Sequence, residues 1–454
     1  MIDSLITIAC CVSTALTIFI LLLPSQYVPK RSPGHGQTTV QVLVLGDIGR
    51  SPRMQYHALS IAKGGGQVDI IGYRESEVHP DISSDPRISI VPLPPHPSFL
   101  QTSNKLLFLL FGPLKVVYQI ACLWWALAYR TKPAQWLLVQ NPPSIPTLAI
   151  ASLACFFRQT KLVIDWHNFG YTILALKLGD THPLVRFSRW YERSFCRSAT
   201  AHICVTTAMA SILKKKFYLE APILPLHDRP ASHLQPIPDE NARRKFLVSL
   251  PEADPVRPLI SSNSLRVLVS STSWTADEDF SLLVDALCRY SEVATTRMPQ
   301  LPTVLALITG KGPQKEMYVK KISQLEAAGN LQKVVVRTAW LSTADYAQLL
   351  ASASLGVSLH TSSSGVDLPM KVVDMFGAGL PVVGWSQFEA WPELVTEGVN
   401  GRGFGSSDEL VGHLVDLFGD RGKLEKLREG ALKESTHRWD DEWNPIAGKL
   451  FGLV

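Results

Sequence analysis

Two arginines beside a short glycine loop are the first residues in this sequence whose types and spacing could do chemistry. Gly49 and Arg50 end the segment 46–50 (GDIGR), which follows an apolar run, and Arg53 comes three positions later. Backbone N–H groups at a helix N-terminus and guanidinium groups both bind phosphate oxygens. The segment therefore indicates a phosphate-binding loop, with a tight turn flanked by solvated arginines as the alternative. No acidic residue ends the next predicted strand, where residues 72–73 (GY) stand instead, so the pattern argues against a nicotinamide cofactor.

The stretch 362–385 (SSSGVDLPMKVVDMFGAGLPVVGW) is the most specific pattern in the chain. A serine-rich loop leads into a predicted helix that opens near Pro369 and stops at residues 377–379 (GAG), before a strand. A helix N-terminus attracts a diphosphate, and a carboxylate on the helix can accept hydrogen bonds from ribose hydroxyls. Glycosyltransferases of the GT-B type build their sugar-nucleotide site in this way; an ordinary loop–helix–strand unit is the alternative. The candidate donor-binding residues are Ser363, Ser364, Gly365, Asp367, Lys371 and Asp374.

A second glycine turn, Gly310-Lys311-Gly312, follows a predicted strand at 303–309. It is not a Walker A motif, because no Ser or Thr follows a Gly-Lys pair at the required spacing. We interpret Gly310 and Lys311 as part of a strand-end loop that edges a ligand cleft and binds the donor. The acidic run 277–279 (DED) superficially resembles a metal-binding D-x-D motif, but we interpret it as charge at a helix N-terminus.

Alternating strands and helices position these loops. In the N-terminal half, apolar runs predict strands at 40–45, 68–72, 88–91, 135–139, 161–165 and 201–205. The C-terminal half repeats the rhythm with strands at 265–270, 303–309, 334–337, 355–359 and 380–384. A strand, a glycine loop and a helix open a Rossmann-like unit, so the predicted fold is α/β of the GT-B type, with two Rossmann-like domains facing each other across a cleft. The expected parts are a membrane anchor with a basic flank (1–31), a first domain (38–222), a linker (223–264), a second domain (265–435) and a C-terminal helix (436–454).

Length and composition agree with this organisation. At 454 residues the chain is too long for one ordinary core, and 46% hydrophobic with 18% charged residues excludes a disordered or fibrous protein. The net charge of +5 is too small and too dispersed to indicate nucleic-acid binding. The seven cysteines form no C-x-x-C pair, so we expect core thiols in a reducing compartment rather than disulfides or zinc ligands.

An uninterrupted apolar run at 4–23 indicates a membrane anchor. Its roughly 20 residues, at about 1.5 Å each, just span a bilayer core of about 30 Å. A cleaved signal peptide would need basic residues before the run and a small-residue cleavage site after it, whereas Asp3 precedes the run and residues 24–30 (PSQYVPK) offer no such site. Lys30 and Arg31 follow, so the positive-inside rule places the rest of the chain in the cytosol.

A second apolar segment, 104–129, lies inside the first predicted domain and allows three interpretations. Pro113 and Lys115 interrupt its middle, and Trp124 and Trp125 crowd one end. Aromatic side chains together with a basic residue suit a helix that lies half-immersed at the membrane interface. A membrane-contacting helix is our interpretation; a buried core helix and a true transmembrane span are the alternatives. The repeated α/β pattern argues against a span, which would put the two halves of the protein on opposite sides of the membrane.

Four stretches together resemble the chitobiosyldiphosphodolichol β-mannosyltransferase family: 45–58 (LGDIGRSPRMQYHA), 163–172 (VIDWHNFGYT), 270–280 (SSTSWTADEDF) and 362–382 (SSSGVDLPMKVVDMFGAGLPV). The resemblance covers nearly the whole chain. It implies a single-pass enzyme of the endoplasmic reticulum membrane with its catalytic domains on the cytosolic face. It further implies inverting transfer of mannose from GDP-mannose to di-N-acetylglucosamine-diphosphodolichol, which forms the first β-1,4-mannosyl linkage of the N-glycan precursor. Other early mannosyltransferases of that pathway are candidate partners.

The sequence departs from the pattern of related retaining GT-B enzymes at the donor site. Those enzymes carry two glutamates eight positions apart; here Asp374 takes the second position, but Val366 takes the first. They also hold the donor diphosphate with an Arg and a Lys, where this chain has residues 270–274 (SSTSW). The phosphate charge must then be met by Lys371, Lys311, helix dipoles or a metal. We therefore predict no required cofactor and no metal-ligating residues, with stimulation by Mg²⁺ as an open alternative.

Inversion needs a general base for the acceptor hydroxyl and charge neutralisation for the departing GDP. In inverting GT-B enzymes the base commonly projects from the N-terminal domain, often from the loop after its first strand, where this chain has Asp47. His167, at the end of another strand, is the competing candidate. We favour Asp47 as the base with His167 positioning a sugar, and the reverse assignment stays open. Glu192 is interpreted as structural. The residues expected on the acceptor side are Gly49, Arg50, Arg53, Asp165 and Asn168.

Two other functions remain open. A catalytically silent membrane scaffold could keep a GT-B fold for subunit contacts, since a fold alone does not imply activity. A lipid-linked glycosyltransferase with another donor, such as UDP-N-acetylglucosamine, would use the same fold, because no residue that reads the nucleotide base can be named.

Overall fold

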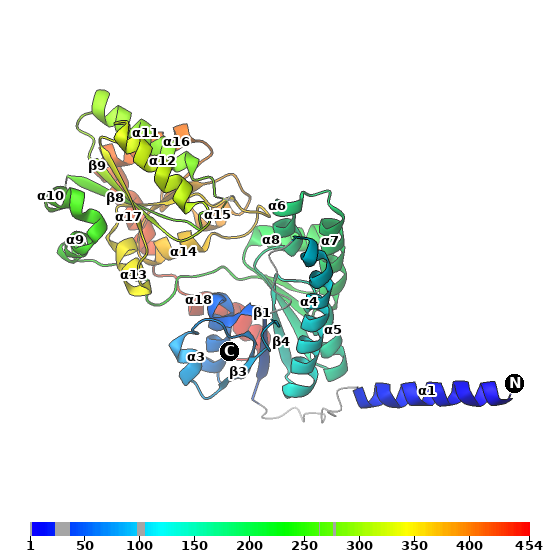
Figure 1. Ribbon diagram of the computed structural model, residues 1–454. Coiled ribbons are helices and arrows are strands. Elements are labelled where there is room, and N and C mark those ends of the chain that lie inside the picture. Colours follow the sequence, from blue (N-terminus) through cyan, green and yellow to red (C-terminus); the bar gives the residue numbers. More distant parts are fainter. Residues whose placement is uncertain (1, 23–36, 98–104, 263, 276–277) are drawn as a thin grey trace. The chain divides into compact units, whose positions relative to one another are not determined.

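The computed structural model describes residues 2–22, 37–97, 105–262, 264–275 and 278–454 (Figure 1). The chain divides into two compact units. The first unit holds residues 1–204, 210–226 and 443–454, and the second holds residues 205–209 and 227–442. The predicted basic flank at Lys30 and Arg31, Asp277 of the acidic run and the first residue of segment 104–129 lie outside the described residues.

The first unit is built on a parallel sheet of seven strands in the order β3-β2-β1-β4-β5-β6-β7. The strands are β1 (Thr39–Asp47), β2 (Gln67–Tyr73), β3 (Ile88–Pro92), β4 (Trp136–Asn141), β5 (Lys161–Trp166), β6 (Ala201–Cys204) and β7 (Ile223–Pro225). The order reverses direction between β1 and β4. In open α/β sheets, ligands bind outside the carboxyl ends of the strands at such a switch point.

Helices cover both faces of this sheet. They are η1 (Ile48–Arg50), α2 (Pro52–Lys63), α3 (Pro80–Ser84), α4 (Lys105–Trp125), η3 (Ala126–Arg130), α5 (Thr147–Arg158), α6 (Gly170–Leu178), α7 (Pro183–Phe195), η4 (Cys196–Ser198) and α8 (Thr207–Lys216). Val42, Leu43 and Val44 of β1 are all buried, although successive side chains point to opposite faces. A strand that is apolar on both faces requires cover on both, as parallel sheets normally have.

The segment 104–129 forms α4 and the turn after it. By length and composition, the stretch Phe111–Arg130 within this segment could cross a membrane. It joins β3 to β4, however, and both strands belong to the sheet that contains β1. A crossing here would put strands of one sheet on opposite sides of the membrane, so a true span is excluded.

The same segment is buried at one end and exposed at the other. Leu123 and Leu127 are buried, whereas Leu114 and Val117 are exposed. In Figure 1, α4 runs beside α5, and the buried Arg158 of α5 donates hydrogen bonds to the carbonyls of Leu127 and Thr131. The helix is therefore fixed on the first unit with an apolar surface left uncovered, as the membrane-contacting interpretation requires. At the chain's start, α1 (Ile2–Leu22) is a 21-residue apolar helix.

The second unit repeats the doubly wound plan with a parallel sheet in the order β10-β9-β8-β11-β12-β13. The strands are β8 (Leu265–Ser271), β9 (Thr303–Thr309), β10 (Val334–Ala339), β11 (Leu355–Ser358), β12 (Val382–Trp385) and β13 (Gly401–Phe404). Relative to its first strand, this order is 3-2-1-4-5-6, the arrangement of nucleotide-binding Rossmann folds. The switch point lies between β8 and β11.

Two cores cover the two faces of the second sheet. The helices are α9 (Glu240–Ser249), η5 (Pro251–Val256), α10 (Arg257–Ser261), α11 (Ser281–Thr296), α12 (Lys315–Ala327), α13 (Thr343–Ser352), α14 (Met370–Gly377), α15 (Trp391–Leu394), α16 (Ser407–Gly419) and α17 (Arg421–Glu434). Leu268 of β8 packs with α11 and α16, while Val267 and Val269 pack with α9, α13 and α14. The alternation along β8 explains why three successive residues, Val267, Leu268 and Val269, are all apolar.

The predicted linker and the predicted C-terminal helix are both helical in the structure. The residues assigned to a linker form α9, η5 and α10, which pack on the second unit. The C-terminal segment forms α18 (Trp439–Trp443), η6 (Asn444–Gly448) and α19 (Lys449–Phe451), and its later part returns to the first unit. There the ring of Phe451 meets that of Trp136 edge to face at 5.5 Å.

A histidine between two carboxylates closes the second unit. His227 Nδ1 lies 2.6 Å from Glu442 Oε1, and His227 Nε2 lies 3.0 Å from Glu393 Oε2. Hydrogen bonds to Glu393 and Glu442 raise the pKa of His227 to about 9. Both ring nitrogens therefore carry protons at neutral pH, and the segment after β7 is tied to α15 and α18.

We expect this contact to make stability depend on alkaline pH. The folded pKa of about 9 exceeds the ordinary value of 6.5, so the stabilisation is complete below pH 6.5 and is lost as pH rises through 9. Replacing His227 by Gln should therefore lower the free energy of unfolding by about 2 to 3 kcal/mol near pH 6, and by much less above pH 9. Urea denaturation of wild type, His227→Gln and the exposed control His437→Gln measures the difference. A gap that stays constant with pH would contradict the ion pairs.

Candidate active site

A buried carboxylate, Asp165, organises the carboxyl end of the first sheet. It is the penultimate residue of β5 and is completely buried. Arg53 of α2, itself buried, donates from Nε to Asp165 Oδ2 at 2.8 Å and from Nη2 to Oδ1 at 3.0 Å. Burial alone would raise the pKa of Asp165, but the charge of Arg53 and the neighbouring histidines hold it well below its usual range. Asp165 is therefore a permanent anion in the folded protein.

Two histidines share this anion. His57 of α2 places Nε2 3.3 Å from Asp165 Oδ2, and its Nδ1 accepts a hydrogen bond of 2.9 Å from the indole of Trp443. Burial lowers the pKa of His57, so its ring is neutral. An indole can only donate, so Nδ1 is the unprotonated nitrogen and the Nε2 proton faces Asp165. Trp443 thus fixes the orientation of a histidine nearly 400 positions away in the chain.

His167 contacts the same carboxylate but also reaches the surface. Its Nε2 lies 2.8 Å from Asp165 Oδ2, and its side chain is 23% exposed. Because Asp165 accepts, Nε2 carries the proton and the lone pair lies on Nδ1. Within the described part of the chain, Nδ1 has no hydrogen-bond partner. A carboxylate that orients an imidazole in this way prepares it to accept a proton.

Asp47 has a different environment. Its Oδ1 accepts hydrogen bonds from the backbone N–H groups of Gly49, Glu75 and Ser76 at 3.1 to 3.3 Å. Burial opposes the shift, but these bonds together lower the pKa of Asp47. A carboxylate so stabilised is a weaker base than an ordinary aspartate. The geometry therefore reverses our preference: Asp47 caps the turn after β1, and His167 is the better-placed proton acceptor.

The predicted phosphate-binding loop is mostly closed to a ligand. The N–H of Gly49 already bonds to Asp47, and a Cβ atom at Gly49 would lie 2.4 Å from the carbonyl oxygen of Glu77. Gly49 is therefore required by close packing. Arg53 binds Asp165 through Nε and Nη2, which gives it a structural role beside the predicted one on the acceptor side. Arg50 differs, because its side chain is 78% exposed beside Asp47 and can still bind an anion.

Asn168 and Glu192 support the same edge of the sheet. Asn168 Oδ1 accepts from the N–H of Phe169 at 2.8 Å at the start of α6. Glu192 is completely buried, and its Oε1 accepts from Ser144 at 2.5 Å and from the N–H of Gly170 at 2.8 Å. Burial raises the pKa of Glu192. These bonds tie the loop after β4 to α6, which fits a structural role for Glu192.

In the second unit, Lys371 projects from the first turn of α14 at the carboxyl end of the sheet. Its ammonium group pairs with Glu278 and lies 3.4 Å from the hydroxyl of Ser273. Glu278 is buried and also accepts from Thr272 at 2.5 Å and from the N–H of Ser273 at 2.8 Å. The loop after β8 and α14 are thus joined by a charged pair, and Lys371 remains 27% exposed.

The serine-rich loop is organised from inside by Asp367. Ser362 and Ser364 donate to its Oδ1, and His360 Nε2 lies 3.1 Å from its Oδ2. Although burial opposes the shift, His360 and the serine hydroxyl lower the pKa of Asp367. Gly365 has a φ of +76°, a conformation that favours glycine. Asp367 and Gly365 therefore shape the loop, and Ser363 lies within it.

Asp374 of α14 has a different environment from Asp367. Its side chain makes no hydrogen bond to another described residue, and the burial of the carboxylate together with the charge of Asp228 raises its pKa to about 7. The phenol of Tyr346 is nearby, because Asp374 contributes to raising its pKa. A carboxylate held without partners beside a second one is poised for a ligand that donates hydrogen bonds.

The loop after β9 packs closely on the loop after β8. A Cβ atom at Gly310 would lie 1.8 Å from the carbonyl oxygen of Thr272, and one at Gly312 would lie 1.8 Å from that of Ser273. Both glycines are thus required by the contact. Lys311 places its ammonium 3.8 Å from the centre of the Trp340 ring, a cation–π contact that leaves it on the surface.

Sequence reasoning missed several partners. Glu278 was interpreted only as helix-terminal charge, and nothing local indicated His57, Trp340 or Trp443. The burial of Glu278, which the sequence does not show, is what requires a cation beside it. No group of three or more His, Cys, Asp or Glu side chains arranged to hold a metal ion occurs among the described residues.

Comparison with known proteins agrees with this architecture. A family model described as "Glycosyl transferase 4-like domain" matches residues 49–227, and one described as "Glycosyl transferases group 1" matches residues 266–420. The chain is 54% identical over 438 residues to a chitobiosyldiphosphodolichol beta-mannosyltransferase of Arthroderma benhamiae, covering 96% of each chain. It is 41% identical over 458 residues to the UDP-glycosyltransferase TURAN of Arabidopsis thaliana, covering 91% of this chain and 97% of that one.

Among solved structures, Anabaena Alr3699/HepE in complex with UDP and glucose is similar with a TM-score of 0.60 at 18% identity, covering 92% of this chain and all of that one. At this identity the likeness shows the fold. Together with the two parallel sheets, it confirms the predicted α/β class with two Rossmann-like domains of the GT-B type.

Removing Arg53 should unfold the first unit far more readily than removing its exposed neighbour. Arg53→Met leaves the Asp165 charge buried without its bidentate partner, which costs about 3 to 5 kcal/mol. Arg50→Met, three positions away, removes an exposed guanidinium and should cost about 0.5 kcal/mol or less. Thermal and urea denaturation of both variants give the comparison. Equal small losses would show that Arg53 does not hold Asp165.

Proposed function

The chain belongs to the chitobiosyldiphosphodolichol beta-mannosyltransferase family of glycosyltransferases, and from this premise we propose that it transfers mannose from GDP-mannose, with inversion, to dolichol-diphosphate-linked di-N-acetylglucosamine. The product carries the first β-1,4-mannosyl linkage of the N-glycan precursor. The observation that carries the proposal is the oriented imidazole of His167, which offers Nδ1 at a strand end while Nε2 is held by Asp165.

We assign the general base to His167. Inversion by a single displacement requires removal of the proton from the acceptor hydroxyl as the bond to the anomeric carbon forms. Nδ1 of His167 accepts that proton, and the negative charge of Asp165 stabilises the imidazolium that results. Arg53 and His57 keep Asp165 in place and ionised. The exposed Arg50 is assigned to the anionic part of the acceptor.

The donor is assigned to the second unit. Lys371 and the N-terminus of α14 supply positive charge for the diphosphate, and Asp374 one turn later accepts hydrogen bonds from the ribose hydroxyls. The loops at Gly310 and Ser363–Gly365 form the surrounding backbone. Neutralising the departing GDP is then the task of Lys371, with any stimulation by Mg²⁺ acting on the same diphosphate.

A lipid-linked glycosyltransferase with another donor is the second candidate. One relative at 41% identity is named a UDP-glycosyltransferase, and its name favours a test of uridine donors. Transfer from radiolabelled GDP-mannose, UDP-glucose and UDP-N-acetylglucosamine to a short-chain lipid-linked chitobiose separates the candidates. We expect incorporation from GDP-mannose alone. If none of the nucleotides binds saturably, the protein is instead a non-catalytic scaffold.

We also propose a location. The apolar helix α1 anchors the chain in the endoplasmic reticulum membrane as a single pass, and both units lie on the cytosolic side. The exposed apolar side chains of α4, including Leu114 and Val117, rest on that membrane. Other early mannosyltransferases of the pathway remain candidate partners at this surface.

Replacing each of the two candidate bases in turn should affect the transfer rate in opposite ways. His167→Ala should lower kcat by about 10² to 10⁴ while GDP affinity stays unchanged, because proton acceptance alone is removed. Asp47→Asn should retain most of the turnover, because the asparagine oxygen can still accept the backbone N–H groups. Steady-state transfer kinetics and GDP calorimetry on folded variants give the answer. A dead Asp47→Asn beside an active His167→Ala would return the base to Asp47.

Donor affinity should rise with pH through the titration of Asp374. The pKa of about 7 means that the carboxylate, the stronger acceptor for ribose hydroxyls, forms only above neutrality. The Kd for GDP-mannose should therefore fall between about pH 6 and pH 8 in the wild type. In Asp374→Asn it should be about tenfold to a hundredfold weaker at pH 8, equivalent to about 1.5 to 3 kcal/mol, and independent of pH.

Asp228→Asn is the matched control for this experiment. It removes the neighbouring charge that helps to raise the pKa of Asp374, so the rise in affinity should move to lower pH without a loss of maximal affinity. If Asp374→Asn keeps the wild-type pH dependence, the ribose contact lies elsewhere.

A further inference from the structure

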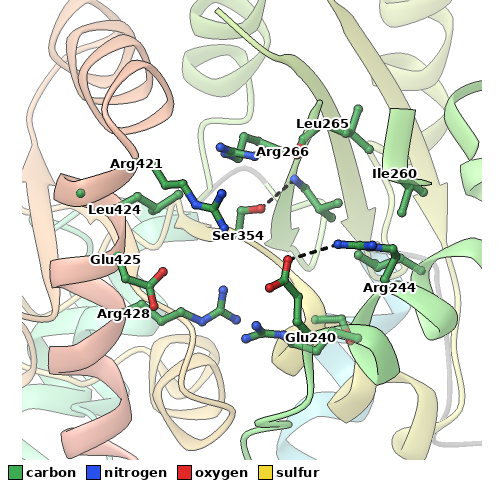
Figure 2. Close-up of a pocket in the computed structure, with 15 residues that line it drawn as sticks. Glu240, Arg244, Ile260, Leu265, Arg266, Ser354, Arg421, Leu424, Glu425 and Arg428 are labelled. Carbon is green, nitrogen blue, oxygen red and sulfur yellow. Dashed lines mark hydrogen bonds and ion pairs between the residues drawn. The ribbon is translucent and has the colours of Figure 1, made fainter. Parts of the chain in front are cut away.

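A cavity of about 530 Å³ lies in the second unit at the amino ends of β8 and β11 (Figure 2). Its walls come from α9, α17, the start of β8 and the turn before β11. The loops assigned to the donor follow the carboxyl ends of the same strands. A strand such as β8, with seven residues at about 3.3 Å each, puts roughly 20 Å between the two edges. The cavity is therefore a separate place from the donor site.

Arginines dominate the walls of this cavity, which we call the arginine cavity. Five line it: Arg243, Arg244, Arg266, Arg421 and Arg428. Two acidic residues, Glu240 and Glu425, face them. Figure 2 shows the guanidinium groups of Arg421 and Arg428 directed toward the space opposite Glu240, which pairs with Arg244 at 3.3 Å. Five positive charges against two negative ones leave an excess of three.

Part of this excess charge has no partner among the described residues. The guanidinium groups of Arg243 and Arg421 make no hydrogen bond or ion pair with any other described residue. Burial and the nearby Arg243 lower the pKa of Arg428 to about 10, and burial and Arg421 lower that of Arg266. Arg428 is nevertheless held in place, because it donates to the carbonyl oxygens of Ala351 and Ala353 at 3.3 and 3.2 Å. Glu240 and Glu425 offset only part of this repulsion between neighbouring cations.

A buried hydroxyl adds a second, independent signal. Ser352 lines the arginine cavity and is only 7% exposed, and its Oγ has no hydrogen-bond partner among the described residues. A buried polar group without a partner costs about 1 to 3 kcal/mol. Several guanidinium groups around one space are donors that an oxyanion satisfies.

We propose that the arginine cavity binds a ligand through a phosphate or diphosphate group. Guanidinium groups bind phosphate oxygens in pairs, and their planar donors suit this anion better than a lysine would. The volume is within the range of small-ligand pockets, and Leu247, Ile260 and Leu424 supply apolar walls for the rest of the ligand. A free phosphorylated metabolite and a phospholipid headgroup share this chemistry. The site lies outside the proposed mannosyl-transfer machinery and would act on it from the far edge of the sheet.

Calorimetric titration of inorganic pyrophosphate into the detergent-solubilised full chain tests the proposal. The variants Arg243→Gln and Arg421→Gln each remove one unpaired cation from the arginine cavity, and Arg297→Gln is the control at an exposed arginine outside it. We expect each cavity variant to lose one binding site per chain or to bind at least tenfold more weakly, while Arg297→Gln binds like the wild type. Transfer activity without added pyrophosphate should be unchanged in all three. Identical binding in all four proteins would overturn the proposal.

A second measurement on the unaltered protein avoids any folding defect in the variants. Arginine-selective modification with p-hydroxyphenylglyoxal, mapped by mass spectrometry, should be slowed by pyrophosphate at Arg243 and Arg421 but not at Arg297. Equal modification rates with and without pyrophosphate would overturn the proposal. Vesicles of phosphatidylcholine with and without phosphatidylinositol 4-phosphate identify the source of the phosphate. Protection by the phosphorylated vesicles indicates a lipid headgroup, and protection by soluble pyrophosphate alone indicates a free metabolite.

Discussion

The proposed base in the first unit depends on one buried negative charge, that of Asp165. Removing a carboxylate from water costs several kcal/mol unless cations and hydrogen-bond donors replace the lost hydration. For Asp165 these groups come from α2, from the end of β5 and, through His57, from the C-terminal segment. Each donor has one position from which it can reach the carboxylate, so the charge fixes these segments relative to one another. The orientation of His167 follows from the same constraint.

The two charged residues of α14 in the second unit differ in their partners. Lys371 is balanced by Glu278, but Asp374 has no hydrogen-bond partner among the described residues and has a pKa near neutrality. The helix that carries both residues begins with Pro369 as its N-cap, so no side chain closes its N-terminus. A carboxylate that has hydrogen-bond partners stabilises the fold, whereas one without partners can accept hydrogen bonds from a ligand.

Local patterns in the sequence predicted what is local in the structure. The apolar runs gave the positions of eleven strands to within a few residues, because a buried parallel strand needs apolar side chains on both faces. Strand β7 has three residues and β13 is half glycine (GRGF), so neither carries that signal. The serine-rich loop and α14 could also be predicted, because the loop, the helix and the next strand are consecutive in the sequence.

Roles that depend on distant partners could not be read in this way. Arg53 stands next to a glycine loop in the sequence, but its partner lies 112 positions further on. Asp47 accepts hydrogen bonds from the backbone N–H groups of Glu75 and Ser76, which any residue type except proline would supply. The type of a residue shows that its side chain needs an ion-pair or hydrogen-bond partner, but only the fold shows which residue that partner is. This is why the preference between Asp47 and His167 changed.

The return of Trp443 to the first unit bears on how the chain is made. During synthesis, the residues of the seven-stranded sheet and then those of the second unit leave the ribosome before Trp443 emerges. Until then the Nδ1 atom of His57 lacks its indole donor, and Trp136 lacks the ring of Phe451. Domains generally fold as units during synthesis, N-terminal first. Here the first unit is finished last, so a nascent chain that stalls within the second unit exposes an incomplete first unit to chaperones and to quality control.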